Sequence, residues 1–301
     1  MIRENRFLNL RSWLFAPASN PKLLYSSVVY KPDAIIFDLE DAVALKEKED
    51  ARELLIEALK TINYGNIQIF ARVNSIKTPF GFDDIKYLVK AGLRNIRLPM
   101  CDTPEEIKQV DEFLSKLEEE NNIKRGTIVI AAALETPIGV YNAYKIAVAS
   151  NRVIGISLGV EDFTRCMGID RTKDEDELNY ARGKVVLEAH AAGVACVDGV
   201  YTKIDDMEGF QIQCEKARSL GFTGKACIHP TQIPYVHKAY MPKQEDIEYS
   251  LLVLEEAKKT DINNGGVISL NGKMIDIPII EKAQKIVALA KSSGLLRSNN
   301  G

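Results

Sequence analysis

Residues 128–159, IVIAAALETPIGVYNAYKIAVASNRVIGISLG, contain the repeating unit that decides the fold. Two short apolar runs, IVIAAAL (128–134) and VIGISLG (153–159), flank a longer segment that opens with Thr136-Pro137, a pair typical of a first helical turn. An apolar run, a helix and a second apolar run are the pattern of two parallel strands joined by a helical crossover. The stretch therefore predicts one strand–helix–strand unit.

The same alternation continues in both directions from this unit. The further apolar runs are SWLFAPA (12–18), DAIIFDL (33–39), IQIFARV (67–73), NIRLP (95–99), ACVDGVY (195–201) and GKACIHP (224–230). Together with the two runs above they make eight predicted strands, and eight strand–helix units are what a (β/α)8 barrel requires. An open doubly wound sheet would rarely need so many. We therefore expect an α/β fold with a TIM barrel over residues 1–241.

Helix signals lie between the predicted strands. Asn20-Pro21 and Thr103-Pro104 each place a side chain that can cap a helix directly before a proline. A long helix is expected from about Asp176 to Ala192, and Gly193 follows it as a C-terminal cap would. These signals agree with helical crossovers between parallel strands.

The pattern changes after the eighth predicted strand and its helix, which predicts a C-terminal extension over residues 242–301. This piece lies outside the barrel count and could cap the site of a neighbouring subunit. Its expected elements are a charged helix from Pro242 to about Lys259, a break at residues 263–266, a hairpin over VISLNGKMID (267–276) that turns at Asn271-Gly272, and a helix from about Pro278 to Ser293.

Composition excludes several classes of protein. With 46% hydrophobic and 27% charged residues the chain can bury a sizeable core, so disorder is excluded. The formal net charge of -3 gives no positive field that would attract nucleic acid. No apolar run approaches the roughly 18 residues of a membrane span, and the first residues lack the apolar core of a signal peptide. We expect a cytoplasmic protein with no nucleic-acid or membrane partner.

Carboxylates follow two neighbouring predicted strands. Glu135 comes directly after IVIAAAL, and Asp162 follows GISLGV. The active site of a TIM barrel lies at the C-terminal ends of its strands, so both side chains are expected on one rim. A solvated charge is the alternative at any single strand end. Because Mg²⁺ prefers oxygen ligands and takes only one or two from protein in many sites, we hypothesise a magnesium site on Glu135 and Asp162.

Arg72 ends the third predicted strand on the same rim. Its planar fork of donors suits two-point binding of a substrate carboxylate. The alternative is an ion pair with the acidic residues after the second strand, and both can hold, because such partners would fix the guanidinium; these residues are Asp38, Glu40 and Asp41. A metal and an arginine on one rim suit carbon–carbon cleavage next to a carbonyl, although these residues alone do not exclude phosphoryl chemistry.

The chain resembles the citrate lyase β subunit family from about Arg11 to Ser293. The motifs that carry the resemblance are RSWLFAPASNP, DAIIFDLEDAVALKEKEDAR, ARVN, RLP, ALETPIG, GISLGVEDF, YAR, GFTGKACIHPTQI and SLNGKMIDIPIIEKAQ. This family is part of a wider group of magnesium-dependent acyl-CoA lyases and aldolases on TIM barrels. The resemblance implies cleavage of a (3S)-citryl thioester, carried on coenzyme A or an acyl carrier protein, into oxaloacetate and an acetyl thioester, with Mg²⁺ as cofactor, in citrate fermentation.

The resemblance also implies roles for single residues. Arg72 of ARVN would bind the oxaloacetate end of the substrate, Glu135 of LETP would bind metal and substrate, and Asp162 of GVEDF would be the second metal ligand. Asp276 of GKMID would act as an acid/base residue supplied by a neighbouring subunit of a trimer. The implied partners are the citrate lyase α and acyl-carrier γ subunits and further copies of this chain.

Two residues depart from the family pattern. Met100 stands where the family usually has lysine after RLP, and Ala18 replaces a glycine in a loop that is expected to approach the thioester carrier. These departures concern the substrate more than the type of reaction. Two other functions stay open: a stand-alone malyl-CoA or citramalyl-CoA lyase with the same metal site, and a non-catalytic scaffold subunit.

Overall fold

The computed structural model describes residues 6–259, 268–270, 273–292 and 295–296. The chain divides into two compact units, Met1–Tyr240 and Met241–Gly301. The break expected at residues 263–266 and the hairpin turn expected at Asn271-Gly272 lie outside the described residues.

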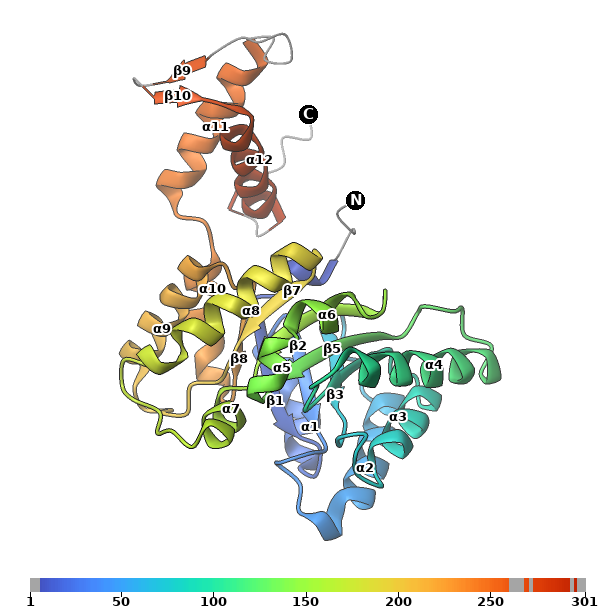
Figure 1. Ribbon diagram of the computed structural model, residues 1–301. Helices are drawn as coiled ribbons and strands as arrows, with labels where there is room; N and C mark the ends of the chain where they lie inside the picture. Colours follow the sequence, from blue (N-terminus) through green and yellow to red (C-terminus); the bar gives the residue numbers. More distant parts are fainter. Residues whose placement is uncertain (1–5, 260–267, 271–272, 293–294, 297–301) are drawn as a thin grey trace. The chain divides into compact units, whose positions relative to one another are not determined.

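Eight parallel strands of the first unit close into a barrel in the order of the chain (Figure 1). The last strand pairs with the first, with Trp13 opposite Ala226, so the barrel closes through hydrogen bonds. The strands are β1 (Ser12–Pro17), β2 (Ala34–Asp38), β3 (Gln68–Arg72), β4 (Asn95–Leu98), β5 (Val129–Leu134), β6 (Val153–Leu158), β7 (Ala195–Asp198) and β8 (Gly224–Cys227). The predicted TIM barrel is confirmed.

The ends of the observed strands differ from the predicted ends by at most one residue, except in β7 and β8. These two strands end three residues earlier than predicted. After β7, the Gly199 carbonyl accepts a hydrogen bond from Lys225 Nζ at 2.9 Å. After β8, the chain turns into the 3-10 helix η5 (Pro230–Gln232), whose proline has no N–H for a strand ladder.

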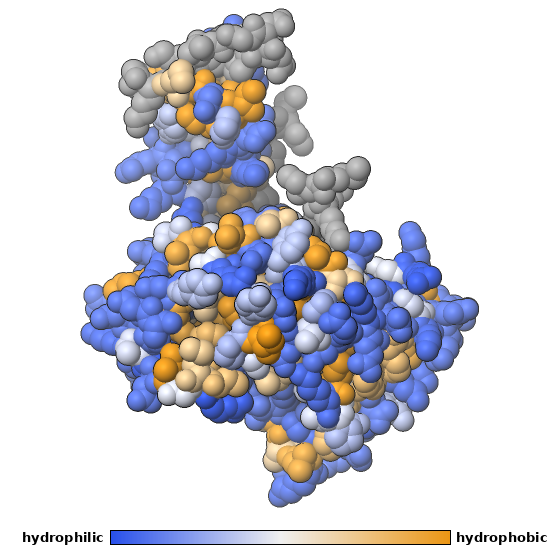
Figure 2. Space-filling model, in the orientation of Figure 1, coloured by the Kyte–Doolittle hydropathy of each residue, from blue (hydrophilic) through white to orange (hydrophobic). Residues whose placement is uncertain are grey.

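Helices follow the strands and surround the barrel (Figure 1). The α-helices of the first unit are α1 (Pro21–Ser26), α2 (Lys48–Thr61), α3 (Gly81–Lys90), α4 (Pro104–Glu120), α5 (Pro137–Tyr141), α6 (Ala143–Val148), α7 (Val160–Met167), α8 (Asn179–Ala192), α9 (Met207–Leu220) and α10 (Ile233–Tyr240). No described helix is both long and apolar enough to cross a membrane. On the face seen in Figure 2, apolar residues of this unit are scattered among hydrophilic ones.

The capping signals act as the sequence predicts. The side chains of Asn20, Thr103 and Thr136 each accept a hydrogen bond from the first turn of the helix that follows. Gly193 ends α8 with a φ of 68°, a left-handed conformation that costs glycine little. The helix expected from Asp176 begins instead as the 3-10 turn η4 (Asp176–Leu178), so α8 starts three residues later.

The strand period explains why charged residues reach the open end of the barrel. Successive side chains of a strand point to opposite sides, so every second residue faces the interior. Ile36 and Phe70 are buried in an apolar cluster with Trp13. Two residues further along the same strands stand Asp38 and Arg72. The apolar cluster thus fills one end of the barrel, and charged side chains line the other.

The second unit has a small apolar core of its own. Its strands pair antiparallel, with Met274 opposite Ser269. Val253, Ile275 and Ala283 are buried together. The elements are α11 (Gln244–Lys259), β9 (Ile268–Leu270), β10 (Lys273–Ile275) and α12 (Ile277–Ser292).

Candidate active site

A pocket of about 430 Å³ lies at the C-terminal ends of the barrel strands. Its lining comes from strands β1, β2, β3, β4, β6, β7 and β8, from the residues that follow several strands, including Glu135 after β5, and from the first turn of α7. Phe15, Leu158 and Ile228 supply apolar walls. The charged lining residues are Asp38, Asp41, Arg72, Arg97, Glu135, Glu161, Asp162 and Asp198. The structure thus brings the predicted residues Arg72, Glu135 and Asp162 into one pocket.

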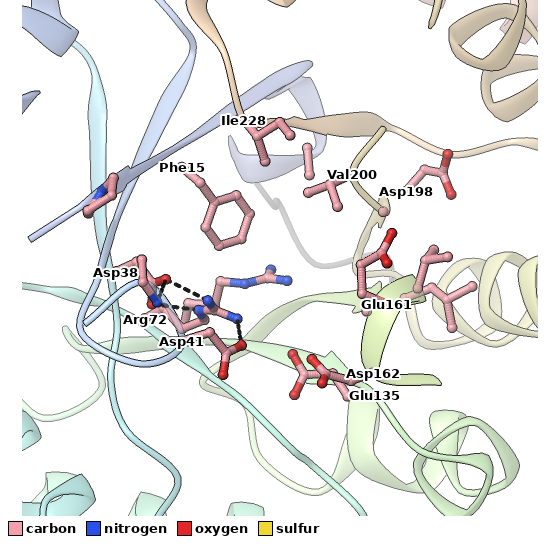
Figure 3. Close-up of a pocket in the computed structure, with 18 residues that line it drawn as sticks. Phe15, Asp38, Asp41, Arg72, Glu135, Glu161, Asp162, Asp198, Val200 and Ile228 are labelled. Atoms are coloured by element: carbon pink, nitrogen blue, oxygen red, sulfur yellow. Dashed lines mark hydrogen bonds and ion pairs between the residues drawn. The ribbon is translucent and has the colours of Figure 1, made fainter. Parts of the chain in front are cut away.

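Arg72 is held by three carboxylates. Its Nε donates to Asp38 Oδ1 at 2.7 Å and its Nη2 to Asp38 Oδ2 at 2.5 Å, a two-point contact (Figure 3). Its Nη1 lies 3.1 Å from Asp41 Oδ2 and 3.1 Å from Glu40 Oε2. Burial acts to lower the pKa of Arg72, but the hydrogen bonds and charge of Asp38 hold it above its ordinary value. The guanidinium is therefore charged and fixed in place.

Glu135 follows β5 and is 3% exposed. Its Oε2 accepts a hydrogen bond from the Met100 backbone N–H at 2.9 Å. A Cβ atom on Gly159 would collide with Glu135 Cγ, so glycine is required for this close approach. Burial raises the pKa of Glu135 to about 7, and Asp162 adds to the rise against the lowering effects of Arg72 and Arg97. The protein therefore disfavours the ionised form of Glu135 relative to water, and a bound cation would oppose that effect.

Asp162 lies in the first turn of α7, next to Glu135 in Figure 3. Its Oδ1 pairs with Arg165 Nη2 at 2.6 Å on the exposed side. Burial raises the pKa of Asp162, and the Asp41 charge adds to the rise. Two neighbouring carboxylates whose ionised forms are both disfavoured suit a divalent cation, which stabilises both charges at once.

The donor set fits a hard cation that keeps several ligands from water or substrate. Burial also raises the pKa of Glu40 to about 8, but its Oε2 forms an ion pair with Arg72 and Glu40 does not line the pocket. In the part of the chain that the structure describes, no three His, Cys, Asp or Glu side chains converge as a complete metal cage. Glu135 and Asp162 could therefore hold an ion such as Mg²⁺ only with other oxygen ligands.

The remaining predicted positions lie elsewhere. Asp276 belongs to the second unit, where it directly precedes α12, is exposed, and accepts a hydrogen bond from the Ile279 N–H at 3.2 Å. Its role in a neighbouring subunit stays a prediction. Ala18 is fully buried in the apolar core and does not line the pocket. Met100 has a φ of 52°, and its backbone, rather than its side chain, holds Glu135.

Sequence reasoning did not identify Arg97 of β4 or Phe15 of β1 as lining residues. The signal for Arg97 lay in NIRLP (95–99), where a charged residue interrupts a buried strand. Arg97 and Arg72 are paired in register on neighbouring strands, so both side chains face the same interior.

Buried charges on the opposite side of the barrel form ion pairs with one another. Lys225 Nζ lies 2.6 Å from Asp198 Oδ2, and Arg182 Nε lies 3.0 Å from Asp198 Oδ1. Arg182 also pairs with Glu175 at 2.7 Å. Burial acts to raise the pKa of Asp198, but Lys225 and Arg182 lower it to about 2. These charges neutralise one another and hold the strand ends together.

Known proteins similar to this chain include two kinds of enzyme. The citrate lyase subunit beta of Leuconostoc mesenteroides subsp. cremoris is 40% identical over 288 residues, which cover 96% of this chain and 95% of the relative. The (3S)-malyl-CoA thioesterase of Cereibacter sphaeroides is 31% identical over 289 residues, which cover 96% of this chain and 97% of the relative.

Two solved structures from Mycobacterium tuberculosis are also similar. The CitE protein in complex with magnesium, acetoacetate and coenzyme A has a TM-score of 0.77 and 29% identity, over 93% of this chain and 97% of that chain. A citrate lyase beta subunit with oxaloacetate and magnesium has a TM-score of 0.67 and 29% identity, over 78% of this chain and 100% of that chain.

The sequence model of one family matches the barrel from its first strand to the residues after its last. That family is described as HpcH/HpaI aldolase/citrate lyase, and the match covers residues 11–230. The resemblance stated from the motifs is confirmed by this match and by the citrate lyase subunits among the relatives. The chain belongs to the HpcH/HpaI aldolase/citrate lyase family and is a carbon–carbon lyase.

Proposed function

We propose that this chain cleaves a (3S)-citryl thioester into oxaloacetate and an acetyl thioester, as the β subunit of a citrate lyase. The observation that carries the proposal is one pocket in which the Glu135 and Asp162 carboxylates lie beside the fixed Arg72 guanidinium. Similarity over nearly the whole length of citrate lyase subunit beta supports the citryl substrate. The Mycobacterium tuberculosis complex with oxaloacetate and magnesium supports the product and the cofactor.

Glu135 and Asp162 would hold Mg²⁺, which when bound stabilises negative charge on the substrate oxygen that becomes the ketone of oxaloacetate. Met100 positions Glu135 through its backbone N–H. Asp38 and Asp41 position Arg72, whose guanidinium faces the bound oxaloacetate end of the substrate. The chain's own groups thus fix the part of the substrate that leaves as oxaloacetate.

The reaction breaks the bond between the hydroxyl-bearing carbon and the acetyl arm. The hydroxyl gives its proton to water in the pocket and becomes a ketone, and the electron pair of the broken bond passes into the thioester as an enolate. The enolate is then protonated at carbon to give the acetyl thioester. Asp276 is exposed in the second unit and is proposed to supply this proton to the site of a neighbouring subunit.

The same proposal includes the assembly. The chain would work with α and acyl-carrier γ subunits and with further copies of itself, so that the C-terminal unit of one copy caps the pocket of another. Identity of 40% with a subunit that bears the name citrate lyase, over 95% of that subunit, supports these partners.

The experiment that tests the proposal measures products released by the purified chain from citryl-CoA, malyl-CoA and citramalyl-CoA, each with Mg²⁺ and with a chelator. Oxaloacetate released from citryl-CoA only in the presence of Mg²⁺ is the expected result. Silence on all three substrates, with and without added α and γ subunits, would overturn the proposal in favour of a scaffold subunit.

A malyl-CoA or citramalyl-CoA lyase is the second candidate. It is favoured by the 31% identity with a (3S)-malyl-CoA thioesterase over 96% of the chain. Release of glyoxylate from malyl-CoA or pyruvate from citramalyl-CoA, faster than oxaloacetate from citryl-CoA, would establish this function instead.

A further inference from the structure

Arg97 is a second arginine of the pocket to which no role has been given. It stands on β4, paired in register with Arg72 of β3 and Ala131 of β5. It is 5% exposed, and its side chain lines the pocket. Two neighbouring strands therefore each place a guanidinium in the same buried space.

The partners of the two arginines differ. Arg72 pairs with three carboxylates, whereas none of the described residues accepts a hydrogen bond from Arg97 or forms an ion pair with it. The Nε of Arg97 is buried without a partner. Its guanidinium carbon lies 5.2 Å from the centre of the Phe15 ring, which is its one contact with an aromatic ring among these residues.

An unpaired buried cation is costly in the free protein. Burial lowers the pKa of Arg97 to about 10, with Arg72 adding to the fall and Glu135 opposing it, so the group still carries its charge at neutral pH. A guanidinium offers five N–H donors and no acceptor. Such a group, buried against an open pocket, is complementary to an anion that enters from outside.

The keto-acid products of the candidate reactions differ in their number of carboxylate groups. Oxaloacetate has two carboxylates, whereas pyruvate and glyoxylate have one each. The carboxylate next to the ketone is common to all three and belongs with the carboxylate-bound metal. Since Arg72 is already paired with acidic residues, Arg97 is the cation left for the carboxylate of the additional arm.

We propose that Arg97 determines substrate specificity by binding the carboxylate that oxaloacetate has and that pyruvate and glyoxylate lack. This inference deepens the proposed function and rests on it. A citryl thioester would satisfy the buried guanidinium, whereas a malyl or citramalyl thioester would leave it unpaired, which disfavours both.

The test compares binding of oxaloacetate and pyruvate, each with Mg²⁺, to the full chain and to Arg97→Met, by calorimetry. Affinity for oxaloacetate should fall on the order of 100-fold, since a buried charge-assisted contact is lost. Affinity for pyruvate should stay within about twofold. The two proteins and the two ligands together form a thermodynamic cycle that isolates the contribution of the additional carboxylate. Arg97→Lys keeps the positive charge but lacks the planar guanidinium, so its affinity for oxaloacetate should lie between those of the wild type and Arg97→Met.

Arg94→Met is the matched control, because Arg94 directly precedes β4 but does not line the pocket. Its Nη1 donates to the Val89 and Leu93 carbonyls at 3.1 and 2.9 Å. The control should lower the melting temperature and leave the oxaloacetate-to-pyruvate ratio unchanged. Arg97→Met removes an unpaired buried charge and should raise the melting temperature of the ligand-free protein.

Equal losses for both ligands would overturn the inference and assign Arg97 to the shared carboxylate. Unchanged oxaloacetate affinity in both Arg97 variants would also overturn it, while release of oxaloacetate from citryl-CoA by the wild-type chain would leave the proposed function intact. A wild-type chain that cleaves malyl-CoA or citramalyl-CoA but not citryl-CoA would overturn the proposed function and this inference together.

Discussion

Buried charged side chains have different partners on two sides of the same barrel. Arg97 and Glu135, on the β4–β5 side, are 5% and 3% exposed. Asp198 and Lys225, on the β7–β8 side, are 1% and 0% exposed. Burial alone therefore does not distinguish the two sides, and any difference between them arises from the partners that the chain supplies.

On the β7–β8 side the chain supplies two cationic partners for Asp198, Lys225 and Arg182. Lys225 lies 2.6 Å from Asp198, and the pKa of Asp198 is lowered to about 2 although burial acts to raise it. On the β4–β5 side the effect of burial on the pKa of Glu135 outweighs that of the nearby arginines and raises this pKa to about 7. Arg97 on the same side has no ionic partner among the described residues, and its Nε is buried without a hydrogen bond. The first pair links strands β7 and β8, whereas the second pair is proposed to bind a ligand.

The largest expected effect is on catalysis, from Glu135→Gln. Removal of the carboxylate takes away a proposed metal ligand, so turnover of citryl-CoA should fall on the order of 10³-fold or more. The melting temperature without Mg²⁺ should stay the same or rise, because a neutral amide replaces a carboxylate whose buried charge is disfavoured. Steady-state release of oxaloacetate and thermal unfolding measure the two outcomes.

Glu112→Gln is the control for that substitution, since Glu112 is an exposed residue of α4 that does not line the pocket. It should change neither turnover nor stability. Near-normal turnover in Glu135→Gln would contradict the assignment of Glu135 to the metal.

The next largest effect is on stability, from Lys225→Met. Asp198 would lose the closer of its two cationic partners, so the free energy of unfolding should fall by about 3–5 kcal/mol. Urea unfolding measures the loss. The double variant Asp198→Asn with Lys225→Met leaves no unpaired charge at this pair and should recover part of it. A loss in Lys225→Met below about 1 kcal/mol would show that the two sides do not differ as proposed.

The sequence was sufficient for much of this comparison. Alternating apolar runs and capped helices predict the barrel, and in a barrel the strand ends meet, which places Arg72, Glu135 and Asp162 on one rim. The side-chain and backbone contacts that distinguish the two sides cannot be predicted from the pattern of strands and helices. Whether Arg97 is paired depends on side chains from other strands, and the Met100 contact with Glu135 is made by the backbone.

The third effect is a pH dependence of opposite sign on the two sides. Glu135 has a folded-state pKa of about 7, above its ordinary 4.5, so the stability it contributes is present below about 4.5 and is lost as pH rises through about 7. Asp198 has a lowered pKa, so its contribution is present above 3.8 and is lost as pH falls through about 2. Of these two contributions, only that of Glu135 changes between pH 6 and 8.

Mg²⁺ should reverse that change, because it binds the ionised carboxylates. The rise in melting temperature on adding Mg²⁺ should be larger at pH 8 than at pH 6. The difference between the wild type and Glu135→Gln, measured at each pH, isolates Glu135 from other titrating groups. If the Mg²⁺-induced rise in melting temperature of the wild type exceeds that of Glu135→Gln by the same amount at pH 6 and pH 8, a metal site on Glu135 would be contradicted.

The smallest expected effect is on stability, and it compares a buried with an exposed carboxylate partner of Arg72. Arg72 pairs both with Asp38, whose side chain is 3% exposed, and with Asp41, whose side chain is 62% exposed. Asp41→Asn should change the free energy of unfolding by only about 0–1 kcal/mol, since exposed pairs are weak. Asp38→Asn should cost more, because it breaks a buried two-point contact. Equal losses in urea unfolding would mean that the number of carboxylates, rather than their burial and geometry, holds Arg72, and the contrast between the two sides of the barrel would then need a different cause.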